Sequence, residues 1–167
     1  MNWLRTLIFT LLAPGLVWVL IPWMILRASR PAAPERLGAQ QRAGALLALI
    51  GFSIYAWTAS DFVRVGKGTP APVFPTQRLV VTGLYRYVRN PMYLGVLTAI
   101  FGEVSFFQSP WLLLYAGIFW LVVTIFVILY EEPTLQKSFR EAYAKYRRNV
   151  RRWIPRLTPY DPDSLEN

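Results

Sequence analysis

Long apolar runs alternate with polar, proline-containing segments along the whole chain. The four runs are Trp3 to Leu26, Ala43 to Ser60, Asn90 to Phe107 and Trp111 to Tyr130. Each is close to the roughly 20 residues that a helix needs to cross about 30 Å of hydrocarbon. Pro14 and Pro22 lie in the first run, and we expect kinks there rather than breaks, because transmembrane helices tolerate proline. The pattern predicts an all-α integral membrane protein with about four transmembrane helices.

The segments between the runs contain the residues that end helices. Arg27 to Arg42 has the prolines and glycine of a short loop outside the bilayer, and Gln108-Ser109-Pro110 is a tight break that makes a hairpin of the last two runs. In Asp61 to Thr82, glycines and prolines exclude a continuous helix, and this segment either covers a site or is a plain surface loop. We expect one domain over residues 1–167: two spans in 1–60, a cytoplasmic loop in 61–89, the hairpin in 90–130, a C-terminal helix in 131–156 and a tail in 157–167.

The C-terminal region is charged but periodic. Its large apolar and aromatic side chains recur at helical spacing, at Leu135, Phe139, Tyr143, Tyr146 and Val150. The basic residues lie mostly off this stripe, which is typical of an amphipathic helix at a membrane surface. Trp153-Ile154-Pro155 should close the helix, and the acidic tail after Tyr160 should be loose.

Charge suggests an orientation in the membrane. The chain has 18 Lys and Arg against 9 Asp and Glu, a net charge of +9. A basic chain can bind nucleic acid or an anionic membrane surface, and the apolar runs favour membrane lipids as partners, with no nucleic acid. Four spans put both termini and the middle loop on one side, together with most of the basic residues. The positive-inside rule places that side in the cytoplasm, and we expect a bacterial or archaeal inner membrane.

Two residue types are missing, and this limits the chemistry. The sequence has no cysteine and no histidine. The first absence excludes disulfides and thiol nucleophiles, and the second removes the commonest general base and metal ligand. Any reaction must therefore use Arg, Lys, Glu, Asp, Tyr, Asn or a bound cofactor, and we expect no metal.

Two clusters of polar and aromatic residues flank the predicted hairpin. GLYRYVRNPMYLG, residues 83–95, leads into the third run, and Tyr130-Glu131-Glu132-Pro133 ends the fourth. So many hydrogen-bonding groups are costly at a membrane boundary unless something binds there. Because a hairpin brings its two ends together, we expect the clusters to form one polar pocket at the membrane surface.

The first cluster offers groups for an anionic or aromatic ligand. Arg86 and Arg89 can bind phosphate or carboxylate, or else anionic headgroups. Asn90 precedes Pro91, so it can cap the helix, contact a ligand, or do both. The free N–H groups of the helix start favour a negatively charged group. Aromatic faces and hydroxyls come from Tyr85, Tyr87 and Tyr93.

The second cluster contains adjacent glutamates. Glu131 and Glu132 should point roughly 100° apart on a helix, so one can face the pocket while the other pairs with an arginine of the C-terminal helix. A solvated acidic helix end is the alternative. Pro133 predicts a sharp redirection that folds the C-terminal helix back towards the third run. Three more residues would then lie near the pocket: Tyr143, Tyr146 and Arg147. The alternative for the two tyrosines is simple burial in the bilayer interface.

Together the two clusters resemble a known family. GLYRYVRNPMYLG, two apolar runs and then EEPTLQKSFREAYAKYRRNVRRWIP is similar to the isoprenylcysteine carboxyl methyltransferase and phospholipid methyltransferase-like membrane enzymes. The resemblance covers about residues 78 to 156, and the first two runs carry no signature. The family pattern usually has histidine where this chain has Asn90. Asparagine can donate a hydrogen bond but cannot act as a base, which weakens any mechanism that needs an imidazole.

The resemblance implies S-adenosyl-L-methionine as methyl donor, bound between the two clusters, with S-adenosyl-L-homocysteine as product. The implied cofactor-binding residues are Tyr85, Arg89, Asn90, Pro91, Tyr93, Gly95, Glu131, Glu132, Tyr143 and Tyr146. A carboxylate can bind the donor's ribose or amino group, tyrosines its adenine and sulfonium, and an arginine its carboxylate. The candidate catalytic residues are Arg147, Glu132 and Arg89.

The acceptor is the least determined part of the prediction. A prenylcysteine-like carboxylate is already ionised and needs only an arginine to hold it, whereas an amine must first lose a proton. We therefore expect a lipophilic carboxyl acceptor that enters sideways from the bilayer. The alternatives are a phospholipid amine, a small amine or thiol, or a non-enzymatic membrane scaffold. The oligomeric state stays open.

Overall fold

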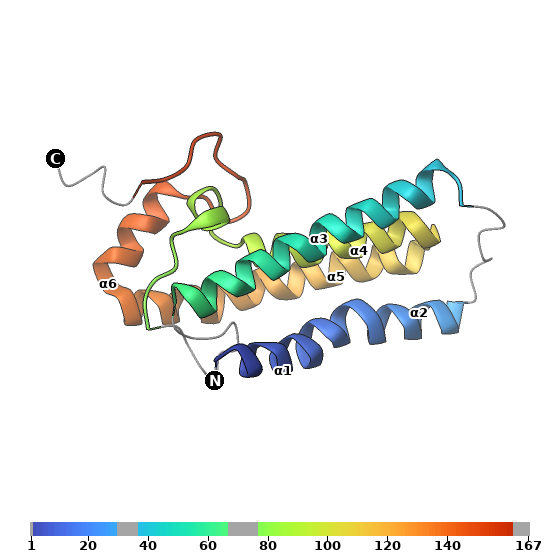
Figure 1. The fold of residues 1–167 in the computed structure, drawn as a ribbon, viewed down its shortest axis with the longest axis horizontal. Helices are drawn as coiled ribbons and strands as arrows, with labels where there is room; N and C mark the ends of the chain where they lie inside the picture. The colour runs from blue at the N-terminus through green and yellow to red at the C-terminus, as the bar shows by residue number, and fades with distance from the viewer. Residues whose placement is uncertain (1, 30–36, 67–76, 162–167) are drawn as a thin grey trace.

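The computed structural model describes residues 2–29, 37–66 and 77–161 (Figure 1). Within these ranges the chain is helical and has no strand, as the apolar runs predict. The helices are α1 (Asn2–Gly15), α2 (Ile21–Ser29), α3 (Ala39–Arg64), α4 (Pro91–Phe107), α5 (Pro110–Phe126) and α6 (Glu132–Asn149). Three short turns join or precede them: η1 (Leu16–Leu20), η2 (Gly83–Arg86) and η3 (Val127–Glu131).

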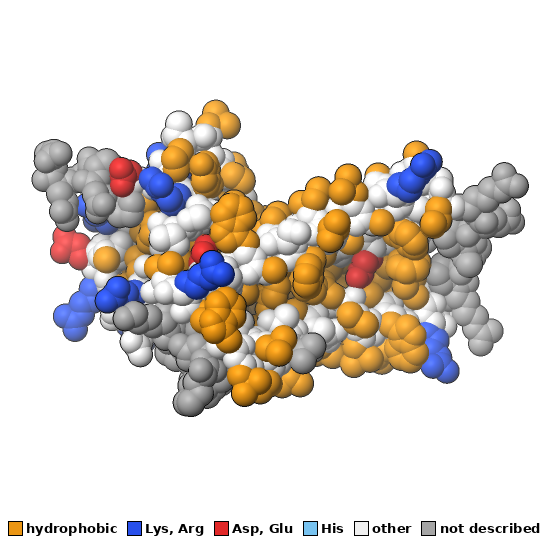
Figure 2. All heavy atoms as spheres, viewed as in Figure 1, with side chains coloured by type: hydrophobic (Ala, Val, Ile, Leu, Met, Phe, Trp, Pro, Cys, Tyr) orange, Lys and Arg blue, Asp and Glu red, His pale blue; other side chains and the backbone are white. Residues whose placement is uncertain are grey.

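The helices have the length and surface of membrane spans. Three helical stretches are long and apolar enough to cross a bilayer: Thr6–Ser29, Ala39–Arg64 and Pro110–Asn149. Helix α4 has 17 residues and a length of about 25 Å, which makes it the short member of the predicted four. Hydrophobic side chains cover the helices in Figure 2, while basic side chains gather at the two ends of the bundle.

Both polar clusters lie at the same end of the bundle. Helix α4 runs away from η2, and α5 returns beside it to η3 and α6 (Figure 1). The hairpin prediction is therefore confirmed. The two ends of the described chain also lie at this end of the bundle, as four passes require. Which membrane face this end occupies stays a prediction.

The most extensive helix contact joins α3 to α4, and glycines make it possible. A β-carbon added at Gly51 would collide with the backbone of Ala99, and one added at Gly102 would collide with the backbone of Ala48. A β-carbon at Gly95 would lie 2.9 Å from the Gly51 carbonyl oxygen. Small residues allow such close approach in lipid. Gly95, whose assignment to cofactor binding stays a prediction, therefore also packs α4 against α3.

Replacing Gly51 with alanine should lower the thermal unfolding midpoint in detergent. The new methyl group would push α3 away from α4, and such overpacking typically costs about 1–3 kcal/mol. Gly117→Ala on α5 is the matched control, because an added β-carbon there meets nothing within 4 Å. It should be neutral or slightly stabilising, since alanine favours the helix by up to about 1 kcal/mol. Equal midpoints for the two variants would contradict the close contact.

The prolines of the first span sit around a π-helical turn. The Ile21 N–H donates to Leu16 O at the end of η1, and Pro22 follows directly. Because proline has no N–H, a carbonyl one turn earlier loses its donor. The Tyr115 hydroxyl donates to Val17 O at 2.9 Å and so supplies a bond from α5. The helix continues through both prolines without a break, as predicted.

The same local arrangement occurs at the second cluster. The Glu132 N–H donates to Val127 O at the end of η3, and Pro133 follows. Helical dihedral angles continue through Glu132, whereas Arg140 has φ 43° and ψ −112°. The prediction that Pro133 redirects the chain is therefore wrong, because the break in the helical backbone lies at Arg140.

Helix α6 folds back over the end of the bundle. Its predicted apolar stripe includes Tyr143, Tyr146 and Val150, which are buried together with Tyr160. Leu79 and Val81, from the segment before η2, pack against this group. The stripe therefore packs against the chain itself, and it holds α6 next to the first cluster.

Candidate functional site

The first cluster is held by the chain that follows α6. Three backbone hydrogen bonds join them: Arg89 N to Arg151 O at 2.9 Å, Arg156 N to Tyr87 O at 2.9 Å, and Tyr160 N to Arg86 O at 2.8 Å. Gly83 starts the cluster with φ 54°, a conformation that favours glycine. The Arg86 Nε donates to Tyr160 O at 2.6 Å, so Arg86 is a structural residue here. Most of the acidic tail after Tyr160, which we predicted to be loose, lies outside the described residues, which end at residue 161.

Glu132 is the centre of a buried ionic group. Its Oε1 accepts hydrogen bonds from Arg89 Nη1 at 2.9 Å and Arg152 Nε at 2.6 Å. Its Oε2 accepts from Arg152 Nη2 at 3.0 Å, and the hydrogen bonds from Arg152 raise the pKa of that guanidinium. Arg147 Nε lies 4.0 Å from the same oxygen, with 53% of its side chain exposed. One glutamate therefore pairs with arginines as predicted, but its hydrogen bonds come from Arg89 and Arg152, which lie outside α6, whereas Arg147 on that helix is 4.0 Å away.

Arg89 is buried but not fully bonded. Only 9% of its side chain is exposed. Nη1 also donates to the Tyr143 hydroxyl at 3.2 Å. Its Nε is buried and has no hydrogen-bond partner among the described residues. A buried charged donor without a partner is costly, so this edge of the guanidinium is suited to an anionic ligand.

Glu131 points to a different neighbour from Glu132. Its Oε2 accepts a hydrogen bond from the Tyr93 hydroxyl at 2.8 Å, which links η3 to the first turn of α4. Glu131 is only half-buried, in contrast to Glu132. The adjacent glutamates therefore diverge as predicted. Glu131 is the one with a carboxylate that is not enclosed by arginines.

The tyrosines of the two clusters converge. The Tyr146 hydroxyl donates to the backbone oxygen of Tyr85 at 2.7 Å. Tyr85 is buried, and burial raises the pKa of its phenol well above the usual value. Its ring packs on Phe62 of α3 at 5.7 Å. The structure thus brings Tyr143 and Tyr146 next to η2, and Tyr143 also contacts Arg89 of the Arg89–Glu132 pair.

Asn90 serves a different purpose from the one that its position suggested. It occupies the N-cap of α4, but its side chain makes no capping hydrogen bond. Its Nδ2 donates instead to Arg152 O at 3.3 Å. The side-chain cap prediction is therefore wrong. Pro91 follows in the first turn of α4, a position that the fixed φ of proline favours, and its side chain is buried.

Arg152 is the site residue that sequence analysis missed. It lies beyond the end of α6, so helical periodicity gives it no position. It nevertheless makes the shortest bond to Glu132, at 2.6 Å. The sequence signal that could have found it is the run of arginines directly before Trp153. In the structure, the centre of the Trp153 ring lies 4.4 Å from that of Trp120 on α5.

A known protein family matches this chain over its second to fourth spans. A family described as phospholipid methyltransferase matches residues 39–142, which include both polar clusters and exclude α1 and α2. A methanethiol S-methyltransferase of Pseudomonas deceptionensis is 35% identical over 77 residues. That match covers 44% of this chain and only 27% of the length of that enzyme. No solved structure matches the chain.

Proposed function

The chain belongs to the phospholipid methyltransferase family, and from this membership we propose that it transfers a methyl group from S-adenosylmethionine to a lipophilic acceptor at the membrane surface. When bound, this donor supplies an electrophilic methyl group on a sulfonium. The site would lie where the two polar clusters meet, at the ends of α4 and α6. Catalysis there would consist mainly of positioning the reactants.

The observation that carries the proposal is the unpartnered Nε of Arg89. Arg89 is one of the residues that the resemblance assigned to cofactor binding. A carboxylate, such as that of the methionine moiety, would satisfy it with a charge-assisted hydrogen bond. The half-buried carboxylate of Glu131 can accept from ribose hydroxyls or an amino group. The half-buried ring of Tyr93, whose hydroxyl bonds to Glu131, can offer a face to adenine or to a positive sulfonium.

Glu132 and Asn90 would act by positioning other groups. Both oxygens of Glu132 already accept from arginines, so this carboxylate holds Arg89 and Arg152 in place and has little capacity left for a ligand. Asn90 binds the backbone of Arg152. Histidine is common at that position in the family. The amide of Asn90 can hold the backbone of Arg152 by a hydrogen bond, but it cannot act as a base.

Arg147 is the arginine best placed to hold the acceptor. Arg89 is committed to Glu132 and Tyr143, whereas Arg147 is 53% exposed and lies at the edge of the ionic group. An exposed guanidinium can bind a carboxylate with two hydrogen bonds. A carboxyl acceptor needs no base, which suits a chain without histidine. The acceptor would reach Arg147 sideways from the bilayer.

A small thiol is the second candidate acceptor. The relative that matches this chain is named for methylation of methanethiol. A thiol must lose its proton to become a good nucleophile, and without histidine a carboxylate such as Glu131 would have to take it. The family description points in a further direction, to a phospholipid amine, which also requires deprotonation.

Methyl transfer from labelled S-adenosylmethionine tests the proposal. Purified protein would be incubated with a prenylcysteine analogue, phosphatidylethanolamine and methanethiol in separate reactions. We expect label in the prenylcysteine carboxyl group. Label only in a water-soluble product would contradict a lipophilic acceptor. No label in any product, from a folded protein, would contradict the methyltransferase itself.

Arg147→Ala should raise the KM for the acceptor about 10- to 100-fold, the equivalent of one charge-assisted hydrogen bond. Affinity for S-adenosylhomocysteine should stay unchanged. Arg148→Ala is the matched control, because Arg148 is the exposed neighbour in the same helical turn and its Nε is directed to Ala144 O. Equal effects of the two variants would contradict a specific role for Arg147.

A further inference from the structure

A carboxylate near the site has no explained partner. Asp61 lies in the last turn of α3, and its Oδ2 is buried without a hydrogen bond to any described residue. The end of a helix carries partial negative charge, which disfavours a carboxylate there. The backbone oxygen of Asp61 accepts hydrogen bonds from Val65 N and Gly66 N. Asp61 is therefore at an unfavourable position, which the nearby positive charge of Arg64 offsets only in part.

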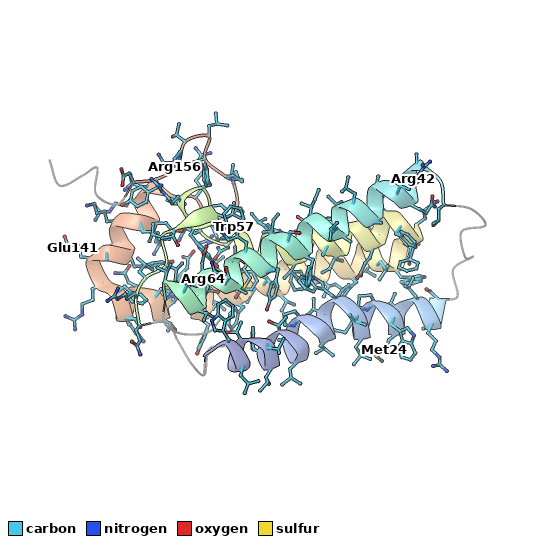
Figure 3. The ribbon with its side chains drawn as sticks, in the orientation of Figure 1. Met24, Arg42, Trp57, Arg64, Glu141 and Arg156 are labelled. Atoms are coloured by element: carbon cyan, nitrogen blue, oxygen red, sulfur yellow. The ribbon has the colours of Figure 1, made fainter. Side chains whose placement is uncertain are left out.

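A second unpartnered oxygen lies on the opposing segment. Thr82 Oγ1 is also buried without a partner among the residues described. Gly83, the next residue, lies close to Asp61: an added β-carbon there would be 2.8 Å from Asp61 Oδ2 and 3.1 Å from Trp57 Nε1. In Figure 3, Trp57 and Arg64 mark this end of α3, beside η2. Two hydrogen-bond acceptors thus flank the start of the first cluster.

Arg64 does not neutralise this carboxylate by a direct contact. Among the ion pairs of the described residues within 4.0 Å, none joins Arg64 to Asp61. Arg64 is exposed, and its guanidinium lies 5.8 Å from the centre of the Trp3 ring. Asp61 is itself only half-buried, so rotation of its carboxylate can present an oxygen to a ligand.

We propose that Asp61 and Thr82 form a subsite for an ammonium group. Both offer oxygen acceptors, an ammonium carries three donors and the opposite charge, and Trp57 adds an aromatic ring beside them. Phe62, the residue after Asp61, contacts the ring of Tyr85, so the subsite borders the candidate donor site. This inference rests on the proposed function. The ammonium comes either from the amino group of the methyl donor or from the headgroup of an amine lipid.

Asp61→Asn tests the subsite with two probes. The first is calorimetric titration with S-adenosylhomocysteine, which carries the amino group but no sulfonium. The second is the KM for phosphatidylethanolamine in nanodiscs, measured as label transfer at saturating donor. Loss of one charge-assisted bond should weaken one of the two by at least about tenfold. Glu141→Gln is the control, because it removes an exposed carboxylate on the outer side of α6 (Figure 3).

The two arms identify the source of the ammonium. Weaker S-adenosylhomocysteine binding assigns the subsite to the donor, and a raised KM with unchanged binding assigns it to the lipid. Thr82→Val should weaken the same one of these two measurements as Asp61→Asn does. It replaces Asp61→Asn as the test if that variant does not fold. Wild-type values in both arms would overturn the subsite alone. A wild-type protein that neither binds S-adenosylhomocysteine nor transfers label would overturn the proposed function, and the subsite with it.

Discussion

Glu132→Gln should destabilise the protein by about 3–5 kcal/mol, the usual cost of removing one partner from a buried ion pair. Glu132 holds Arg89 and Arg152, and its side chain is only 7% exposed. Glutamine keeps one oxygen acceptor but no charge, so it would leave the buried Arg89 guanidinium uncompensated. The thermal unfolding midpoint in detergent measures the loss.

Glu131→Gln is the matched control for that experiment. A glutamine oxygen can still accept the hydrogen bond from the Tyr93 hydroxyl, the bond that Glu131 makes here. Its stability should change by no more than about 1 kcal/mol, the net value of an ordinary hydrogen bond. Equal destabilisation by the two adjacent substitutions would show that Glu132 is not the centre of the ionic group.

Glu131→Gln should instead weaken the binding of S-adenosylhomocysteine, by about 10- to 100-fold. This range corresponds to about 1.5–3 kcal/mol for a hydrogen bond to a charged group. The reason is that Glu131 is the half-buried carboxylate of the pair, with a side chain not enclosed by arginines. Unchanged affinity in a folded variant would remove Glu131 from the donor site.

Local sequence signals predicted the helices well, because each depends on residues close together in the chain. The lengths of the apolar runs determined the spans, and Gln108-Ser109-Pro110 determined the hairpin turn. The stripe through Tyr143 and Tyr146 predicted the buried face of α6. The hairpin alone was enough to predict that the two polar clusters meet, since its two ends must lie side by side.

Contacts between distant segments could not be predicted in the same way. Gly95 belongs to a motif associated with cofactor binding, but its packing role follows from α3, whose backbone lies against it. Asn90 stands at a helix start, yet its side chain binds Arg152, 62 residues later. Arg152 itself follows a break at Arg140 that no proline or glycine marks. Such pairings depend on tertiary packing.

The most direct test of the proposed function is a titration of S-adenosylhomocysteine into the purified, folded wild-type protein. We predict saturable binding at one site per chain. At 100 times the dissociation constant, the ligand should stabilise the fold by about 2.7 kcal/mol, visible as a higher unfolding midpoint. Neither binding heat nor a change in midpoint would contradict a methyl-donor site at the junction of the two clusters.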